Sequence, residues 1–132
     1  KIDYCFCFGH HILKGEIIEV YKNKIINFHP SILPLYPGVK AIDQSILDNK
    51  SILIGNTAHF IDKGIDTGPI IMQSIAPKTL FKTQGYDGVL NLQLPMLEFI
   101  YKKLIDNKIT VKKQKVIVND IACTPKFFYN NE

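Results

Sequence analysis

The chain has 132 residues, of which 46% are hydrophobic and 21% are charged, and its formal net charge is +4. This length allows one domain with a single core, and the composition is that of a globular protein rather than a disordered one. No apolar run approaches the roughly 20 residues of a membrane span, and we see no signal-peptide pattern, so we expect no membrane partner.

The basic residues are all lysines, because the sequence contains no arginine. Arginine is the usual bidentate clamp for carboxylates and phosphates, so an anionic substrate must be held by lysines, backbone N–H groups, helix ends or another chain. The lysines form no dense block and no nucleic-acid motif is present, so we expect no nucleic-acid partner. Cys5 and Cys7 lie in an apolar run, where cysteine behaves as a small buried hydrophobe, and this predicts a cytoplasmic protein.

The first part of the chain predicts a parallel βαβ unit. Residues 2–8 form an apolar run typical of a buried strand, residues 14–21 have helical spacing, and residues 24–28 form a second apolar run. Because the chain opens almost directly on a strand at Lys1, we expect further sequence ahead of it, including the first strands of the sheet. The sheet then has an unpaired edge, which favours a homodimer.

The next part of the chain alternates a rigid loop with regular elements. Residues 29–38 contain three prolines and a glycine, which excludes a regular element. We expect a helix over 39–48 with its buried side at Ala41, Ile42, Ser45 and Ile46, and strands over 52–60 and 69–75.

A longer helix is predicted over residues 86–106, kinked or started at Pro95. Its apolar positions are Leu90, Leu94, Leu97, Ile100 and Leu104. A last strand follows at 116–118, and the tail from Thr124 is expected to be irregular. We therefore divide the chain into a catalytic domain, 1–109, and a short strand with a tail, 110–132.

Two polar clusters follow predicted strands. Asn27 and His29 are two residues apart at a strand end, so they face one side, and His59, Asp62 and Asp66 belong to the next strand end and its loop. Open α/β sheets bind ligands at the carboxyl ends of their strands. We expect the two clusters to meet around one substrate.

An amide, an imidazole and a carboxylate suit acyl transfer to an amine. Asn27 can donate an N–H to a developing oxyanion, and a protonated His29 can do the same and later release its proton. Asp66 can accept the proton that the attacking amine loses. No nucleophilic residue is required.

Structural interpretations stand beside these roles. His29 next to a proline is typical of a loop, Asn27 can complete a strand end, and Asp66 before Thr67-Gly68-Pro69 can be a turn former. A hydrogen bond between His59 and Asp62 can stabilise the loop. The spacing of the histidines and carboxylates is not that of a metal site, so we expect no metal.

Two motifs resemble those of the 10-formyltetrahydrofolate-dependent formyltransferases. Residues 27–38, NFHPSILPLYPG, resemble the family signature. Residues 57–71, which begin with TAHF and end in DTGPII, resemble its second motif. Residues 8–13 resemble the folate-contacting loop. The resemblance implies a Rossmann-like α/β fold whose mostly parallel sheet is flanked by helices and lacks its N-terminal strands.

The resemblance also implies roles for individual residues. Asn27 and His29 would polarise the formyl oxygen, and Asp66 would manage protons. The pterin of 10-formyltetrahydrofolate would contact two loops, at His11, Ile12 and Leu13 and at Ile61, Asp62 and Gly64. Pro30, Ser31 and His59 would lie beside the substrate, and Leu33–Pro34 matches a bond that is often cis in this family.

The acceptor is a small-molecule primary amine in this interpretation. His11, Leu94 and Pro95 replace the Arg, Glu and His that glycinamide ribonucleotide formyltransferases carry, and the tail is too short for a tRNA-binding domain. We therefore favour an amino-sugar nucleotide over glycinamide ribonucleotide. The alternatives are a folate-binding fragment without activity, and hydrolysis of the formyl donor with water as the acceptor.

Overall fold

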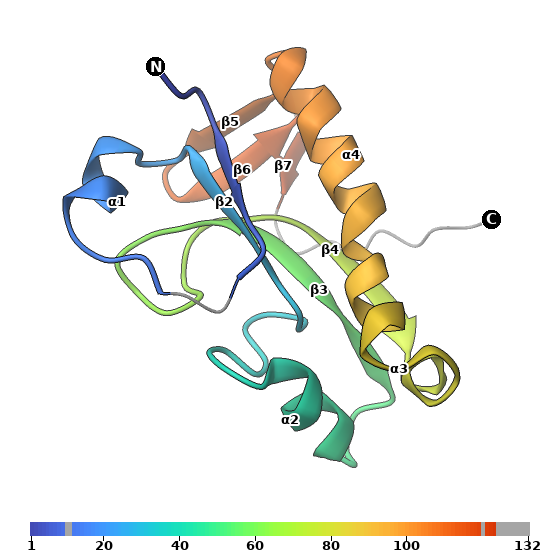
Figure 1. Ribbon diagram of the computed structural model, residues 1–132. Helices are drawn as coiled ribbons and strands as arrows, with labels where there is room; N and C mark the ends of the chain where they lie inside the picture. The colour runs from blue at the N-terminus through green and yellow to red at the C-terminus, as the bar shows by residue number, and fades with distance from the viewer. Residues whose placement is uncertain (10–11, 120, 124–132) are drawn as a thin grey trace.

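The computed structural model describes residues 1–9, 12–119 and, as backbone alone, 121–123. The elements follow one another as shown in Figure 1: β1 (Cys5–Cys7), α1 (Glu16–Val20), β2 (Ile25–His29), α2 (Ala41–Leu47), β3 (Leu53–Phe60), β4 (Ile70–Pro77), α3 (Thr79–Asn91), α4 (Gln93–Ile105), β5 (Ile109–Lys112), β6 (Lys115–Val118) and β7 (Ile121–Cys123). The α/β class expected from the sequence is confirmed.

The main sheet has the strand order β1-β2-β3-β4. Strands β1 and β2 are parallel and joined through α1, which confirms the predicted βαβ unit. Strand β3 pairs antiparallel with β2, and β4 pairs antiparallel with β3. β1, β2 and β4 therefore run in one direction and β3 runs against them. The expectation of a mostly parallel sheet is confirmed for strand direction, although both pairs that involve β3 are antiparallel. Periodicity identifies strands without giving their direction, which explains the difference.

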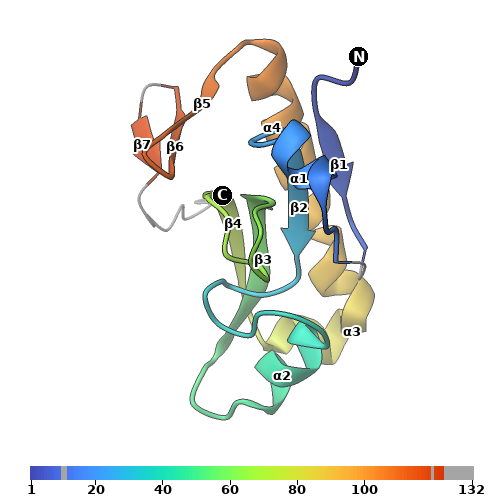
Figure 2. The same ribbon diagram turned by 90° about the vertical axis from the view of Figure 1, so that its left-hand side faces the viewer.

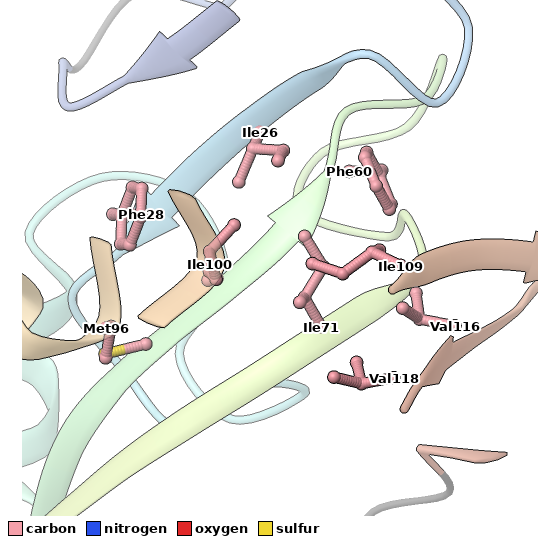
Figure 3. Packing of buried hydrophobic residues seen from close by; sticks show 10 residues of the cluster. Ile26, Phe28, Phe60, Ile71, Met96, Ile100, Ile109, Val116 and Val118 are labelled. Atoms are coloured by element: carbon pink, nitrogen blue, oxygen red, sulfur yellow. The ribbon is translucent and has the colours of Figure 1, made fainter. Parts of the chain in front are cut away.

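The core lies on the face of this sheet that α4 covers. Ile26 and Phe28 of β2 and Phe60 of β3 alternate with polar residues, so all three point to α4. Met96 and Ile100 of α4 meet them, as Figure 3 shows. The polar residues between them, which include Asn27 and His29, consequently share the opposite face.

The strands β5, β6 and β7 form a second, antiparallel sheet, of which only residues 116–118 are predicted from the sequence. Figure 2 shows this sheet to one side of the main one. Ile109, Val116 and Val118 are buried in the same cluster as Ile26 and Phe60, so the small sheet extends the main core. The tail from Thr124 lies outside the described residues.

The predicted long helix is two helices in the structure. Gly85, with φ of 62° and ψ of −153°, breaks α3, and Pro95 lies in the first turn of α4, where a missing N–H is tolerated. The predicted buried face is partly wrong, because Leu90 is 40% and Leu94 61% exposed. The residues that face the core are Val89, Gln93, Met96 and Ile100. These four residues keep helical spacing across Leu92, so the buried stripe begins one position before the predicted one.

The first strand is less buried than its composition predicts. Cys5 is exposed, and Cys7 and Phe6 are partly buried. Beyond the strand, Phe8 is 53% exposed and stacks on the buried ring of Phe28 at 4.7 Å between ring centroids. Strand β1 is thus the outer strand of the sheet, held by aromatic contacts on one face.

Among the described residues, no helix is long and apolar enough to cross a membrane.

Candidate active site

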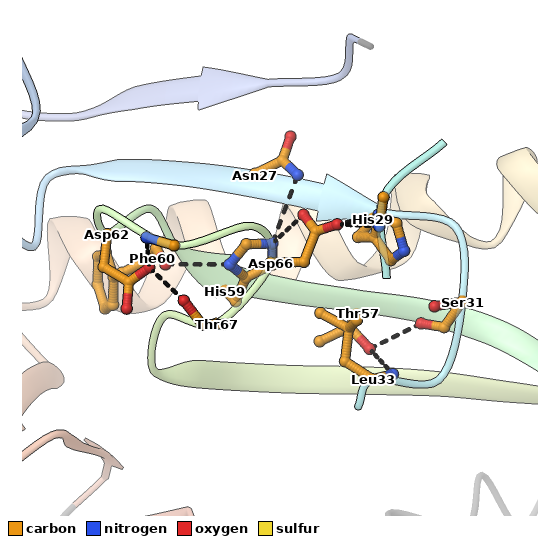
Figure 4. A network of polar contacts seen from close by, with 12 residues as sticks. Asn27, His29, Ser31, Leu33, Thr57, His59, Phe60, Asp62, Asp66 and Thr67 are labelled. Carbon is orange, nitrogen blue, oxygen red and sulfur yellow. Dashed lines mark hydrogen bonds and ion pairs between the residues drawn. The ribbon is translucent and has the colours of Figure 1, made fainter. Parts of the chain in front are cut away.

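The predicted polar residues gather on the sheet face opposite α4. Asn27 of β2 lies directly across from His59 of β3, and His29 lies across from Thr57. Neighbours across an antiparallel pair share a face, so these four side chains form one polar patch. Figure 4 shows it from close by. The two clusters meet as expected, but through antiparallel pairing rather than through two carboxyl ends at one edge.

Asp66 reaches this patch because the loop after β3 folds back over it. Its backbone has a left-handed φ of 53°, a conformation that Asp tolerates better than most residues. The carboxylate Oδ2 accepts a hydrogen bond from the Gly38 N–H at 2.7 Å and lies 3.3 Å from His29 Nδ1. The other oxygen, Oδ1, lies 3.5 Å from His59 Nε2. Asp66 therefore stands between the two histidines.

His29 is held at both ring nitrogens. Nε2 lies 2.9 Å from the backbone carbonyl of Tyr36, which can only accept, so this nitrogen carries a hydrogen. Nδ1 faces Asp66. The imidazole is 5% exposed, and a ring with hydrogens on both nitrogens donates to both acceptors at once.

His59 orients the amide of Asn27. Its Nδ1 donates to the Phe60 carbonyl at 3.0 Å, and burial lowers the pKa of the ring below its ordinary value. The neutral ring then has a lone pair at Nε2, which accepts from Asn27 Nδ2 at 3.4 Å. The second hydrogen of that amide nitrogen remains available for another acceptor.

Asp62 shapes the loop that carries Asp66. Its Oδ1 accepts from the Gly64 N–H at 3.0 Å and from Thr67 Oγ1 at 2.7 Å. The stabilising partner of Asp62 is therefore Thr67, and the alternative of a bond to His59 does not describe this loop. Lys63 adds an exposed ion pair with Glu19 of α1 at 2.6 Å.

A second network fixes the loop after His29. Thr57 Oγ1 donates to the Ser31 carbonyl at 2.8 Å and accepts from the Leu33 N–H at 3.0 Å and from Gln73 Nε2 at 2.8 Å. Ser31 is 1% exposed and its hydroxyl donates to the Leu35 carbonyl at 2.6 Å. The structure thus places Ser31 under the loop, where it does not line the cavity described next. The Leu33–Pro34 bond is cis, as expected.

One cavity of about 590 Å³ opens over the polar patch. It is lined by every other described residue predicted for the site, namely Ile12, Leu13, Asn27, His29, Pro30, His59, Ile61, Asp62, Gly64 and Asp66. His11 lies outside the described residues. Within the described part of the chain, no group of three or more His, Cys, Asp or Glu side chains is arranged to hold a metal ion.

Part of the cavity wall was not predicted from the sequence. Lys40 and Asp43 line it from the start of α2, and Tyr86 and Leu90 line it from α3. The Tyr86 hydroxyl donates to Asp43, which joins the two helices at the rim. Tyr86 and Asp43 are 43 positions apart, and neither lies in a recognisable motif, so no signal in the sequence indicates their contact.

The comparisons with known proteins agree with this geometry. The model of the formyl transferase family matches residues 3–84. The chain belongs to this family. It is 46% identical over 66 residues to phosphoribosylglycinamide formyltransferase of Bacillus subtilis, covering 49% of this chain and 33% of that protein. It is 32% identical over 111 residues to formyltetrahydrofolate deformylase of Haemophilus influenzae, covering 81% of this chain and 39% of that protein.

A solved structure of the family has the same fold. The formyltransferase PseJ from Anoxybacillus kamchatkensis superimposes with a TM-score of 0.72 at 28% identity, covering 85% of this chain and 60% of PseJ. Its crystals contain UDP-4,6-dideoxy-4-formamido-L-AltNAc and tetrahydrofolate. The fold is thus the Rossmann-like formyltransferase fold. The chain spans roughly a third of the length of the two curated relatives named above.

Proposed function

We propose that this chain carries the catalytic residues of a folate-dependent formyl transfer from 10-formyltetrahydrofolate to a primary amine. The observation that carries the proposal is the convergence of Asn27, His29 and Asp66 on one cavity, with His29 Nδ1 and Asp66 Oδ2 3.3 Å apart. Membership of the formyl transferase family and the tetrahydrofolate in PseJ support the folate donor.

The cavity suits a flat heteroaromatic donor. Ile12, Leu13, Ile61 and Ile65 give it apolar walls, and its volume of about 590 Å³ is in the range of small-molecule sites. Backbone groups of the loop beside Asp62 would hold the polar edge of a pterin. A bound donor would supply the formyl group, and the residues of this chain would stabilise charge and move the proton.

Asn27 would stabilise the charge that develops on the formyl oxygen. One hydrogen of its amide nitrogen is engaged by His59, and the other can donate into the cavity. A preorganised donor of this kind lowers the barrier because it does not reorganise during the reaction.

His29 and Asp66 would move the proton. The new bond joins the amine nitrogen to the formyl carbon, and the bond from that carbon to the donor nitrogen breaks. One proton must leave the amine and reach the departing nitrogen. Asp66 accepts this proton from the amine. His29, whose Nδ1 faces the same carboxylate, stabilises the negative charge of Asp66 and can share the proton.

For the acceptor we favour an amino-sugar nucleotide, and glycinamide ribonucleotide is the alternative. PseJ, with its bound formamido sugar nucleotide, matches 85% of this chain. The relative from Bacillus subtilis, by its name, supports the alternative. In α4, Leu94 stands at the position for which the resemblance implies a glutamate in glycinamide ribonucleotide formyltransferases. It is 61% exposed and does not line the cavity, so this position offers no carboxylate to the acceptor.

Hydrolysis of the donor is a second candidate function. The deformylase of Haemophilus influenzae matches 81% of this chain, a larger share than the 49% matched by the Bacillus subtilis transferase. The same three residues would then activate water in place of an amine.

Turnover of 10-formyltetrahydrofolate separates these functions. The protein is incubated with the donor alone, with a UDP-4-amino-4,6-dideoxy sugar, and with glycinamide ribonucleotide, while tetrahydrofolate and formate are measured. Amine-dependent tetrahydrofolate without formate supports transfer, and formate without amine supports hydrolysis. Binding of the donor with no product under any condition would refute an enzymatic function and leave a folate-binding protein.

A further inference from the structure

We infer that Tyr36 and Asp48 position the catalytic imidazole from outside the cavity: the Tyr36 carbonyl fixes the His29 ring, and the bond from the Tyr36 phenol to Asp48 fixes that carbonyl. The inference rests on the proposed function only for its consequence for turnover. Neither Tyr36 nor Asp48 lines the cavity. Both are therefore positioning residues in this account.

The first link joins His29 to the Tyr36 backbone. Nε2 of His29 lies 2.9 Å from the Tyr36 carbonyl oxygen, and a carbonyl accepts without donating. The contact therefore requires a hydrogen on Nε2. It also turns Nδ1 toward Asp66 Oδ2, 3.3 Å away, so each ring nitrogen faces an acceptor. If this carbonyl moved, Nε2 would lose its acceptor and Asp66 alone would hold the ring.

The second link is the unusual backbone of Tyr36. Its φ is 54°, in the left-handed region that side chains other than Gly, Asn and Asp rarely adopt. A residue persists there when its surroundings fix it. Ser31 Oγ contributes with a contact to the Tyr36 carbonyl at 3.2 Å, but its shorter bond, at 2.6 Å, is to Leu35.

The third link is the phenol. The Tyr36 hydroxyl donates to Asp48 Oδ2, and this bond raises the pKa of Tyr36 and lowers the pKa of Asp48. Asp48 follows the end of α2 and is itself fixed, because its Oδ1 accepts the Lys50 N–H at 2.9 Å and its carbonyl accepts from Lys78 Nζ. The phenol thus ties the left-handed turn to the junction of α2, β3 and α3.

Four variants test the inference, with the His29 ring observed directly by nitrogen NMR of the imidazole. Tyr36→Phe and Asp48→Ala remove the phenol bond, and Asp48→Asn retains it because an amide can bond a phenol in either orientation. Lys78→Ala removes a contact of Asp48 without changing the phenol bond. Turnover of 10-formyltetrahydrofolate is measured on the same samples.

We expect a wild-type Nε2–H signal that is shifted by the bond to the Tyr36 carbonyl and that exchanges slowly with water. Tyr36→Phe and Asp48→Ala weaken this bond, which gives a faster-exchanging Nε2–H and about tenfold lower kcat, with the KM for the donor changed less than twofold. Asp48→Asn retains the wild-type ring signals, and Lys78→Ala retains them even where it lowers the Tm.

An unchanged His29 Nε2–H signal in Tyr36→Phe would overturn the inference, as would altered ring signals in Lys78→Ala equal to those in Asp48→Ala. The two proposals fail separately. Wild-type protein that shows the expected Nε2–H signal but no turnover would refute the proposed function alone, because the NMR signals do not depend on activity.

Discussion

Asp66 is the residue in which the backbone and the chemistry of the site depend on each other most closely. Its left-handed φ of 53° directs the carboxylate back over β2, where the Gly38 N–H and His29 Nδ1 both approach Oδ2. Gly38 also has a positive φ, of 80°. Two loops that are 28 residues apart therefore meet at one oxygen atom. Asp66 therefore links the two loops through its contacts with the Gly38 N–H and with His29, and does more than form a turn.

His59 makes the stability of the protein depend on pH. Burial lowers its pKa from 6.5 in the folded state, so the unfolded chain binds this proton at higher pH than the folded chain does. Its contribution to stability is therefore complete above the unfolded value and is lost as the pH falls below it.

The prediction is that wild-type protein loses stability more steeply than His59→Gln as the pH falls from about 7.5 to about 5, by up to about 1.4 kcal/mol per pH unit. Urea unfolding at a series of pH values measures the difference, and Gln retains a polar group opposite Asn27. Parallel stability curves for the two proteins would contradict the assignment of a depressed pKa to His59.

At the residue scale, the local motifs carry most of the information about the site. Asn27, His29 and Asp66 are predicted because a two-residue spacing and a polar loop are local patterns, and the structure brings them together. The contacts of Tyr36 and Asp43 with partners 12 and 43 residues away are not predicted, because they depend on how the elements pack.

At the scale of elements, Thr57 joins β3 and β4 to the loop after His29. Its buried hydroxyl donates to Ser31 and accepts from Leu33 and Gln73. Thr57→Val preserves the shape and removes the hydroxyl, which leaves the buried Leu33 N–H without this acceptor. We expect a loss of about 2–3 kcal/mol in the free energy of unfolding.

Thr57→Ser is the matched control, because it retains the hydroxyl and removes only a methyl group. It should lose about 1 kcal/mol. Urea denaturation of the two variants measures both losses. A valine variant at least as stable as the serine variant would show that the methyl group matters more than the hydrogen bonds, contrary to this account.

The elements show where sequence patterns stop being informative. Alternation identifies β2 and β3 and the face each buries, but the antiparallel direction of β3 follows from the path of the connecting chain. The buried stripe of α3 and α4 runs through Val89, Gln93 and Met96, one position before the predicted one. Two stripes one position apart both have helical spacing, so periodicity alone does not decide which of them faces the core.

At the scale of the whole molecule, α4 connects the main sheet with the small one. Ile100 is fully buried among residues of β2, β3, β4 and β6. Ile100→Ala removes most of this side chain and leaves a cavity, so we expect a loss of about 3–4 kcal/mol. Ile105, one turn later in the same helix, is 61% exposed.

Ile105→Ala makes the same chemical change at an exposed position at the end of the helix, and it should alter stability by no more than about 0.5 kcal/mol. Chemical unfolding of both variants gives the comparison. Similar losses at the two sites would mean that α4 does not pack through Ile100, and the division between its buried and exposed faces would need revision.

The central claim is that Asp66 handles the proton in formyl transfer, and Asp66→Asn tests it most directly. Asn tolerates a left-handed backbone and its amide oxygen can still accept the Gly38 N–H, so the fold and donor binding should persist. Exposed Asp106→Asn at the end of α4 is the control. We predict that kcat for consumption of 10-formyltetrahydrofolate falls by about 10²–10⁴-fold in Asp66→Asn, with donor affinity within about twofold of wild type. Turnover in Asp66→Asn within about twofold of wild type, with the donor still bound, would contradict the claim.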